Sequence, residues 1–312
     1  MALGAIVNIL ITGGTGLIGR ALIQGLNTDN IIVLTRNKKN AANILPAHIK
    51  LISSLAEVNF NELDVVINLA GESIVGRRWS EQQKSLICQS RWHITQQLVE
   101  KIQTATKAPK CFISGSAIGF YGRQGAKAIT ESQKDVYDEF SHHVCQKWES
   151  IALSAQSDKT RVCVLRTGIV LANNGGALQK MLPAFKLGLG GPIANGQQFM
   201  SWIHIDDMVA IIMATINQPS LTGIINATAP TPVSNQVFSE TLSTVLSRPC
   251  FFRVPALVLK VIMGESSDLL LYGQHVIPDK LLKNNFKFQY PSLQIALKQL
   301  LLKCDNNTNN NN

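Results

Sequence analysis

The sequence has few charged residues, because Asp, Glu, Lys and Arg together make up only 16% of its 312 residues. It also lacks any block of like charges, although its 29 basic residues outnumber its 20 acidic ones. The net charge of +9 is spread along the chain, so we expect an attraction to anionic ligands but no nucleic-acid partner. The apolar fraction of 46% predicts a well-buried globular protein.

Cysteine pairs and metal-ligand spacings are missing as well. The six cysteines include no CxxC pair, and no cluster of His, Cys and carboxylates has the spacing of a metal site, so no metal is expected. The apolar start, Ala2–Ile11, lacks a preceding basic region and runs directly into a glycine turn. It is predicted to be a buried strand, too short to span a bilayer. These absences indicate a cytoplasmic protein with no membrane partner.

Short β-branched runs alternate with helical stretches through the first half of the chain. This alternation, with strands that are apolar throughout, predicts an α/β fold with a doubly wound, Rossmann-type parallel sheet. The expected strands are Ile6–Thr12, Ile31–Thr35, Ile49–Ser53, Val65–Leu69, Lys110–Ser114 and Val162–Thr167. The expected helices are Leu17–Leu26, Glu81–Thr104 and Phe140–Ala155.

The most informative motif joins the first strand to the first helix. Gly13 permits a sharp turn off the strand, Gly16 permits close approach of a pyrophosphate, and Gly19 permits close helix packing. The helix N-terminus then offers free N–H groups and a positive dipole end to phosphates. Strand, glycines, helix and second strand together predict dinucleotide binding, and a glycine turn without a ligand is the alternative. The expected phosphate-binding residues are Gly13, Gly14, Thr15, Gly16, Leu17, Ile18 and Gly19.

The end of the second strand indicates which dinucleotide is bound. An NAD site usually has an acidic residue here to bond the ribose 2′-hydroxyl, whereas this chain has Thr35 and Arg36. A guanidinium with a nearby hydroxyl suits a 2′-phosphate, so NADP(H) is the expected cofactor. The alternative is a solvated basic loop, which we favour for Lys38 and Lys39 but not for Arg36.

After Gly168 the pattern changes to shorter elements separated by loops rich in Gly and Pro, and the leucine-rich Lys280–Lys303 is expected to close the fold. We expect residues 1–170 to form an NADP-binding Rossmann core. Residues 171–303 would supply the remaining sheet strands and a small C-terminal α/β lobe for the substrate. Residues 304–312, which are mostly asparagine, are predicted to be a disordered tail.

With these residues in place, the chain resembles the extended short-chain dehydrogenase/reductase superfamily. The spacing of the three glycines is that superfamily's version, and Val66–Gly71 resembles its fourth-strand motif. The resemblance implies that Leu69, Ala70 and Gly71 flank the adenosine and ribose. It also implies that Ser116, within Ser114–Gly122, is the active-site serine, and it makes a homodimer through two paired helices plausible.

A narrower resemblance extends to about Leu301. It rests on Leu69–Glu72, Arg77–Trp79, Arg91, Lys147–Glu149, Arg166–Gly168, Leu187–Pro192 and Ser201–His204. These motifs are similar to an atypical subgroup, named epimerase family proteins, whose members carry a short C-terminal domain of unknown function. The resemblance implies NADP binding and a Rossmann-type fold, but it brings no established reaction.

The superfamily's chemistry rests on a Tyr-x-x-x-Lys pair, in which the lysine holds the nicotinamide ribose and lowers the tyrosine pKa. The superfamily places a glutamate four residues after that lysine. Aligning on Glu149 puts Cys145 at the lysine position and Ser141 at the tyrosine position. Neither side chain can replace its counterpart, so the pair is missing.

Other residues are candidates for the missing roles. Tyr121 is a candidate acid beside Ser116, although in the superfamily the matching tyrosine mainly shapes the substrate pocket. Glu72 and Arg91 are candidate cofactor contacts, with a solvated helix face as the alternative for Arg91. Arg77 or Arg78 could clamp an anionic substrate, and His204 is a second candidate for substrate binding. For the remaining residues we favour surface solvation (His142 and His143) and packing (Cys145). Asp206, which with His204 and Asp207 resembles an active-site element, could equally be a helix N-cap.

Two functions are consistent with these residues. The first is an NADP(H)-dependent oxidoreductase or epimerase that acts on a small polar substrate with an unusual proton donor. The second is a non-catalytic NADP(H)-binding or redox-sensing protein that acts through a protein partner. The missing pair favours the second function, whereas Ser116 and the polar set of Glu72, Arg77 and His204 favour the first.

Overall fold

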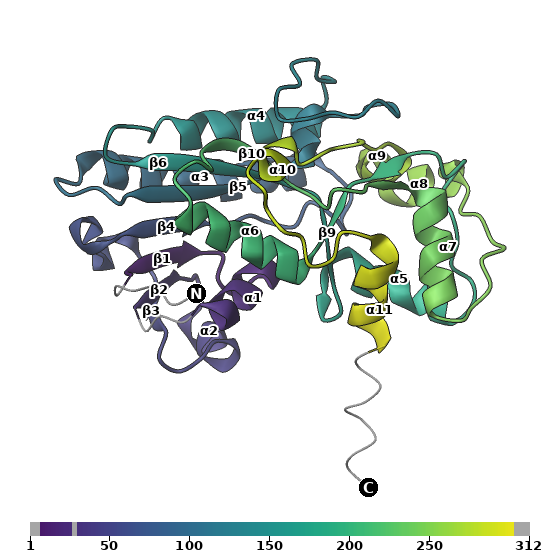
Figure 1. The fold of residues 1–312 in the computed structure, drawn as a ribbon, viewed down its shortest axis with the longest axis horizontal. Coiled ribbons are helices and arrows are strands. Elements are labelled where there is room, and N and C mark those ends of the chain that lie inside the picture. The colour runs from purple at the N-terminus through teal and green to yellow at the C-terminus, as the bar shows by residue number, and fades with distance from the viewer. Residues whose placement is uncertain (1–6, 27–29, 303–312) are drawn as a thin grey trace, which may run out of the picture.

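The computed structural model describes residues 7–26 and 30–302. The predicted strand start at Ile6 and the predicted disordered tail, 304–312, lie outside the described residues. A seven-stranded parallel sheet forms the centre of the fold (Figure 1). Its strands, in spatial order, are β3 (Lys50–Ile52), β2 (Ile31–Leu34), β1 (Ile9–Thr12), β4 (Val65–Asn68), β5 (Cys111–Ala117), β6 (Arg161–Thr167) and β10 (Gly223–Ala227).

The apolar strands bury both of their faces, as expected for a parallel sheet covered by helices. In β1, Ile9 and Ile11 belong to one hydrophobic cluster, while Leu10 between them belongs to another on the opposite face. All three side chains are fully buried. This two-residue alternation places a separate helix layer on each side of the sheet and confirms the doubly wound fold.

One helix layer combines an early and a late segment of the sequence, and the other comes from segments between them. On the face of Ile9 and Ile11 lie α1 (Leu17–Gly25) and α6 (Ile205–Asn217), which pack against each other. On the face of Leu10 lie α3 (Glu81–Thr104) and α4 (Phe140–Leu153). The strand order reverses between β1 and β4, and in such sheets this switch point opens a crevice for ligands at the carboxyl ends of the strands.

Most predicted boundaries agree with the structure to within one or two residues, but two differences affect the site. First, β5 continues to Ala117, so Ser116 lies on a strand and not in a loop. Second, the basic segment predicted as a loop forms the helix α2 (Lys38–Ile44), because the Asn37 side chain accepts a hydrogen bond from the backbone N–H of Asn40. The connections also contain 3₁₀ turns, η1 (Leu55–Glu57), η2 (Phe60–Glu62) and η3 (Ile118–Tyr121).

The second half completes the sheet with β10 and adds elements beyond its carboxyl edge. Two small sheets are formed by β7 (Ile169–Ala172) with β9 (Trp202–His204), and by β8 (Phe199–Met200) with β11 (Val233–Ser234). The helical elements are α5 (Gly176–Lys186), α7 (Asn235–Val245), α8 (Ala256–Met263), η4 (Gly264–Ser267), α9 (Asp268–Leu271), α10 (Asp279–Lys283) and α11 (Leu293–Leu302). As expected, the C-terminal segment closes the fold, since α11 packs on α7 and joins the cluster beneath β1. Among the described residues, no helix has both the length and the hydropathy needed to cross a membrane.

Candidate functional site

The turn after β1 has no room for side chains. Gly13 has φ +71°, and a Cβ atom there would lie 2.5 Å from the carbonyl of Leu69 at the end of β4. A Cβ at Gly19 would lie 2.4 Å from the carbonyl oxygen of Gly13. These approaches are possible only for glycine. Gly14 is equally restricted, since its Cβ would lie 2.8 Å from the Val33 side chain of β2, a constraint that only the folded structure reveals.

The helix that follows begins without a side-chain cap. Gly16 is the N-cap residue of α1, and the first turn contains no acidic residue. The backbone N–H groups there point out from the strand ends, where the helix dipole adds a partial positive charge. The turn therefore has the form of an anion site, as its sequence predicts.

After β2, the basic side chains of Arg36 and Lys38 differ in their contacts, because only Lys38 forms an ion pair with another described residue. Lys38 forms an ion pair with Glu57, with 3.0 Å between Nζ and Oε2. Arg36 is exposed and forms no hydrogen bond or ion pair with any residue in 7–26 or 30–302. The hydroxyl of Thr35 accepts a bond from the backbone N–H of Asn37 and so helps fix the turn. Because β1 and β2 are adjacent and parallel, the end of β2 with Arg36 lies beside the glycine turn that follows β1.

At the end of β4, Arg91 supports the backbone of the loop. Its Nη2 donates to the carbonyl of Glu72 at 2.9 Å, and its Nη1 donates to the carbonyl of Ile87 on α3. A Cβ on Gly71 would lie 3.0 Å from the guanidinium carbon. Burial lowers the pKa of Arg91, so this side chain does not lie on a solvated face. It holds the Gly71–Glu72 backbone in position, and direct contact of these residues with a cofactor stays a prediction.

Ser116, Glu149 and Arg166 form a buried network at the ends of β5 and β6. The Ser116 hydroxyl donates to Glu149 Oε1 at 2.6 Å. Arg166 donates to both oxygens of the same carboxylate, from Nε at 2.9 Å and from Nη2 at 2.7 Å. All three residues are at most 5% exposed. The Arg166 Nη1 atom is also buried and has no hydrogen-bond partner in the structure.

One face of α4 points toward this network. Ser141, Cys145 and Glu149 are spaced four residues apart and so lie on one side of the helix. A Cβ on Gly119, just past Ser116, would contact both Ser141 and Cys145, at 3.2 Å and 3.8 Å. Burial raises the pKa of the Cys145 thiol to about 11, so it is protonated at neutral pH. This placement agrees with the alignment on Glu149 and with the packing interpretation of Cys145.

Tyr121 is buried in the interior and does not face a solvent-open cleft. Its hydroxyl lies 2.8 Å from Asn226 Oδ1, to which it donates, and 3.2 Å from the carbonyl of Thr130. Burial raises the pKa of this phenol, which opposes proton release near neutral pH. These contacts favour a supporting role for Tyr121. His142 is also buried, with its Nδ1 2.5 Å from the Phe120 carbonyl, so the expectation of surface solvation was wrong for this residue.

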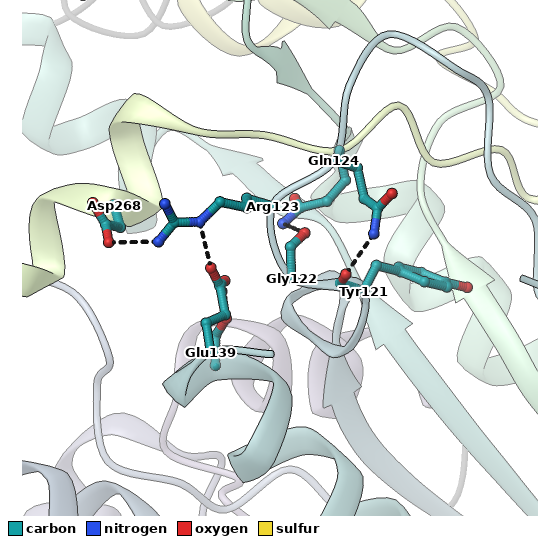
Figure 2. A network of polar contacts seen from close by, with 8 residues as sticks. Tyr121, Gly122, Arg123, Gln124, Glu139 and Asp268 are labelled. Carbon is teal, nitrogen blue, oxygen red and sulfur yellow. Dashed lines mark hydrogen bonds and ion pairs between the residues drawn. The ribbon is translucent and has the colours of Figure 1, made fainter. Parts of the chain in front are cut away.

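Arg123 links the loop after Ser116 to the C-terminal part of the chain (Figure 2). Its guanidinium forms ion pairs with Glu139, next to α4, and with Asp268 on α9, at 3.1 Å and 3.0 Å. It also lies against the rings of Tyr137 and Tyr272. No local sequence pattern predicts this contact, because Asp268 is 145 residues away from Arg123.

The candidate substrate residues Arg77 and His204 have very different surroundings. Arg77 is exposed on the loop after β4, next to Gly76, where a Cβ would lie 3.0 Å from the Lys180 ammonium of α5. The His204 ring is completely buried, and it packs against Tyr290 with 3.8 Å between ring centroids. His204 is the N-cap residue of α6, so of the two alternatives for Asp206 the capping role is wrong. The structure thus brings Arg77, but not His204, to an open surface.

Burial lowers the pKa of His204, which gives a testable pH dependence. The unfolded state takes up a proton as the pH falls below about 6.5, whereas folded His204 stays neutral to lower pH. Stability is therefore lost as the pH falls from that value toward the folded pKa. In urea unfolding, we expect the free energy of unfolding of the wild type to fall more steeply below about pH 6.5 than that of His204→Gln. The two slopes should differ by at most about 1.4 kcal/mol per pH unit. Equal slopes would show that folded His204 titrates normally.

Comparison with known proteins identifies the fold and the family together. Residues 9–227, more than half of the chain, match the sequence profile of the NAD dependent epimerase/dehydratase family. The chain belongs to this family. Residues 254–300, which run from before α8 into α11, match a domain of unknown function, DUF1731. The predicted family and its C-terminal domain are thus confirmed.

Relatives of this epimerase-family chain span nearly its whole length. An epimerase family protein of Arabidopsis thaliana, labelled chloroplastic, is 38% identical and aligns with 95% of this chain and 87% of its own. One from Staphylococcus saprophyticus is 37% identical over 94% of this chain and 98% of its own. A crystal structure of a human epimerase family protein with NADPH is 32% identical, with a TM-score of 0.86, and covers 94% of this chain and 99% of its own.

Within the epimerase-family fold, the role of Arg166 depends on a distant partner. Its motif, Arg166–Gly168, is visible in the sequence, but the carboxylate that binds the arginine lies on α4 and only the fold reveals it. In residues 7–26 and 30–302, no three His, Cys, Asp or Glu side chains gather where they could hold a metal ion.

Proposed function

We propose that this chain binds NADP(H) across the carboxyl ends of β1, β2 and β4. The uncapped start of α1 faces the pyrophosphate, and the glycine turn gives it access to the backbone. The unpaired guanidinium of Arg36 would receive the 2′-phosphate, and this single observation favours NADP(H) over NAD(H). The NADPH in the structure of the human relative supports the same choice.

We further propose that the cofactor is used in a redox reaction on a small polar substrate. NADP(H), when bound, supplies or accepts a hydride. The usual Tyr and Lys side chains are replaced by Ser141 and Cys145, and the buried Cys145 thiol stays neutral. A proton that accompanies the hydride must therefore move through another group.

The Ser116–Glu149 pair is the best placed group for this proton. Because the Ser116 hydroxyl gives its hydrogen to Glu149, its oxygen is left to accept a hydrogen bond from a substrate hydroxyl. A proton taken from the substrate can then pass to Ser116 while the serine proton passes to the carboxylate. Arg166 holds the carboxylate with two N–H donors and fixes its direction.

The substrate is proposed to carry a negative charge. Arg77 and Arg78 are exposed on the loop beyond the end of β4, and the Lys180 ammonium lies beside the same loop at Gly76. Three cations on one side of the strand ends would attract a phosphate or carboxylate group.

A non-catalytic role remains the second candidate, and the replacement of the Tyr–Lys pair favours it. In that case NADP(H) binding would change the surface offered to a partner protein. The two candidates differ in one observable, which is transfer of hydride to a second molecule.

Hydride transfer can be measured with NADPH deuterated at C4, screened against sugar nucleotides, aldehydes and quinones. We expect deuterium to appear in one of these classes, and Ser116→Ala to slow its transfer by at least ~100-fold, because a proton-transfer group is lost. Ser114→Ala is the matched control on the same strand. NADPH affinity should be unchanged in both variants. Tight NADPH binding without any deuterium transfer would contradict the redox proposal and favour the non-catalytic role.

A further inference from the structure

The helix α8 is apolar and yet stays outside the hydrophobic core. None of its residues is buried, and Lys260 is its only charged residue. Leu257, Val261 and Ile262 are between 64% and 72% exposed. Its substantial packing partner among the described elements is η4, which directly follows it. An apolar helix in this position has a face that nothing in the described chain covers.

Two neighbouring loops extend this apolar face. The segment 249–254 runs along the loop 187–194, since the N–H of Val254 donates to the carbonyl of Pro192, and a Cβ on Gly188 would touch Pro249. The two loops carry Leu187 and Phe251, which are 74% and 87% exposed. We call Leu187, Phe251, Phe252, Leu257, Val261 and Ile262 the α8 surface. It lies at the end of the molecule away from β3 (Figure 1).

Positive charges predominate around the α8 surface, and the acidic residue nearest to α8 in the sequence, Glu265, forms an ion pair with Lys84. The chain has no acidic residue between Asp158 and Asp206, or between Glu240 and Glu265. These stretches carry four exposed cations near the surface, none of which forms an ion pair with a described residue: Lys186, Arg248, Arg253 and Lys260. Such a surface needs a partner that is apolar in its interior and negative at its face.

We propose that the α8 surface docks on the headgroup layer of a bilayer containing anionic lipids. The leucine, valine and phenylalanine side chains enter the boundary between headgroups and acyl chains, and the four cations bind the anionic headgroups. A second copy of this chain fits less well, because a symmetric contact places the same predominantly positive patch on both sides of the interface. Docking of this kind needs no membrane-spanning segment, so it replaces the expectation of no membrane partner, which rested on the missing span.

Flotation of the full chain with vesicles tests this proposal. We expect the chain to bind vesicles of phosphatidylcholine mixed with phosphatidylserine, and not to bind vesicles of phosphatidylcholine alone. High salt should release the bound chain. The double variant Leu257→Asn and Val261→Asn should weaken binding at least tenfold. Ile295→Asn, which changes an exposed apolar residue on α11 outside the surface, should bind like the wild type.

Three results would overturn the proposal. The first is that the chain does not bind the mixed vesicles, and the second is that the α8 variant binds them as well as the wild type does. The third is that the wild type sediments as a dimer whereas the α8 variant sediments as a monomer. The last result would assign the surface to a second copy. NADPH titration of the same variants shows whether they are folded. It also measures cofactor binding separately from vesicle binding, so a failure of either proposal can be recognised by itself.

Discussion

Arg36→Asp is expected to reverse the cofactor preference of this chain. The wild-type guanidinium is exposed and unpaired at the end of β2, and its charge-assisted bonds to a 2′-phosphate are worth about 1.5–3 kcal/mol. The aspartate removes these bonds and adds repulsion, so the dissociation constant for NADPH should rise at least ~100-fold. NADH has no 2′-phosphate, and an acidic residue at this position can bond its ribose hydroxyl, so NADH affinity should hold or improve.

Lys39→Asp is the matched control, because it makes the same charge change nearby on α2, which points away from the strand end. Fluorescence titration with both cofactors should show a much smaller loss of NADPH affinity for this variant. If the two substitutions weaken NADPH equally, the effect comes from the overall field of the basic segment, and Arg36 does not contact the phosphate.

Glu149→Ala is expected to cause the largest loss of stability. It leaves the Arg166 guanidinium buried without its carboxylate, and breaking such a pair from one side costs about 3–5 kcal/mol. One Arg166 N–H is already unpaired, so the remaining network has no spare acceptor. Urea unfolding measures the loss directly, as a lower midpoint at an unchanged denaturant dependence.

Two further variants separate the buried charge from simple loss of contacts. Replacing both partners, as Glu149→Leu with Arg166→Met, should recover most of the stability, because no charge is then left unpaired. Ser116→Ala removes only one donor to the carboxylate and should cost about 1 kcal/mol. A Glu149→Ala cost as small as that of Ser116→Ala would show that the network contributes little to the fold.

The parts of this molecule that the sequence predicts are those with local causes. The glycine turn is a local feature, formed by Gly13, Gly16 and Gly19. The apolar pattern of β1, which buries both faces of the strand, spans only four residues. The family resemblance aligned Ser141, Cys145 and Glu149 at four-residue spacing, and the structure places all three on one helix, α4. The fold and the conformation of the glycine turn could therefore be predicted from the sequence.

The parts that could not be predicted depend on contacts between distant segments. His204 has the sequence surroundings of a site residue, but Gln299, 95 residues further on, accepts its Nε2–H and buries it. Tyr121 is a candidate acid in the sequence, but in the structure its hydroxyl donates a hydrogen bond to Asn226, which is 105 residues away. Gly14 gains its restriction only when β2 packs behind the turn. At each of these three positions, the residue's role depends on a contact with a distant segment, which no local pattern contains.

The most direct test of the account is a titration of the wild-type chain with NADPH and with NADH. The uncapped α1 N-terminus serves both cofactors, so any difference between them reports on the 2′-phosphate and on Arg36. The account predicts that NADPH binds at least tenfold more tightly at low salt, with the difference shrinking as salt is added. Equal affinities, or tighter binding of NADH, would contradict it.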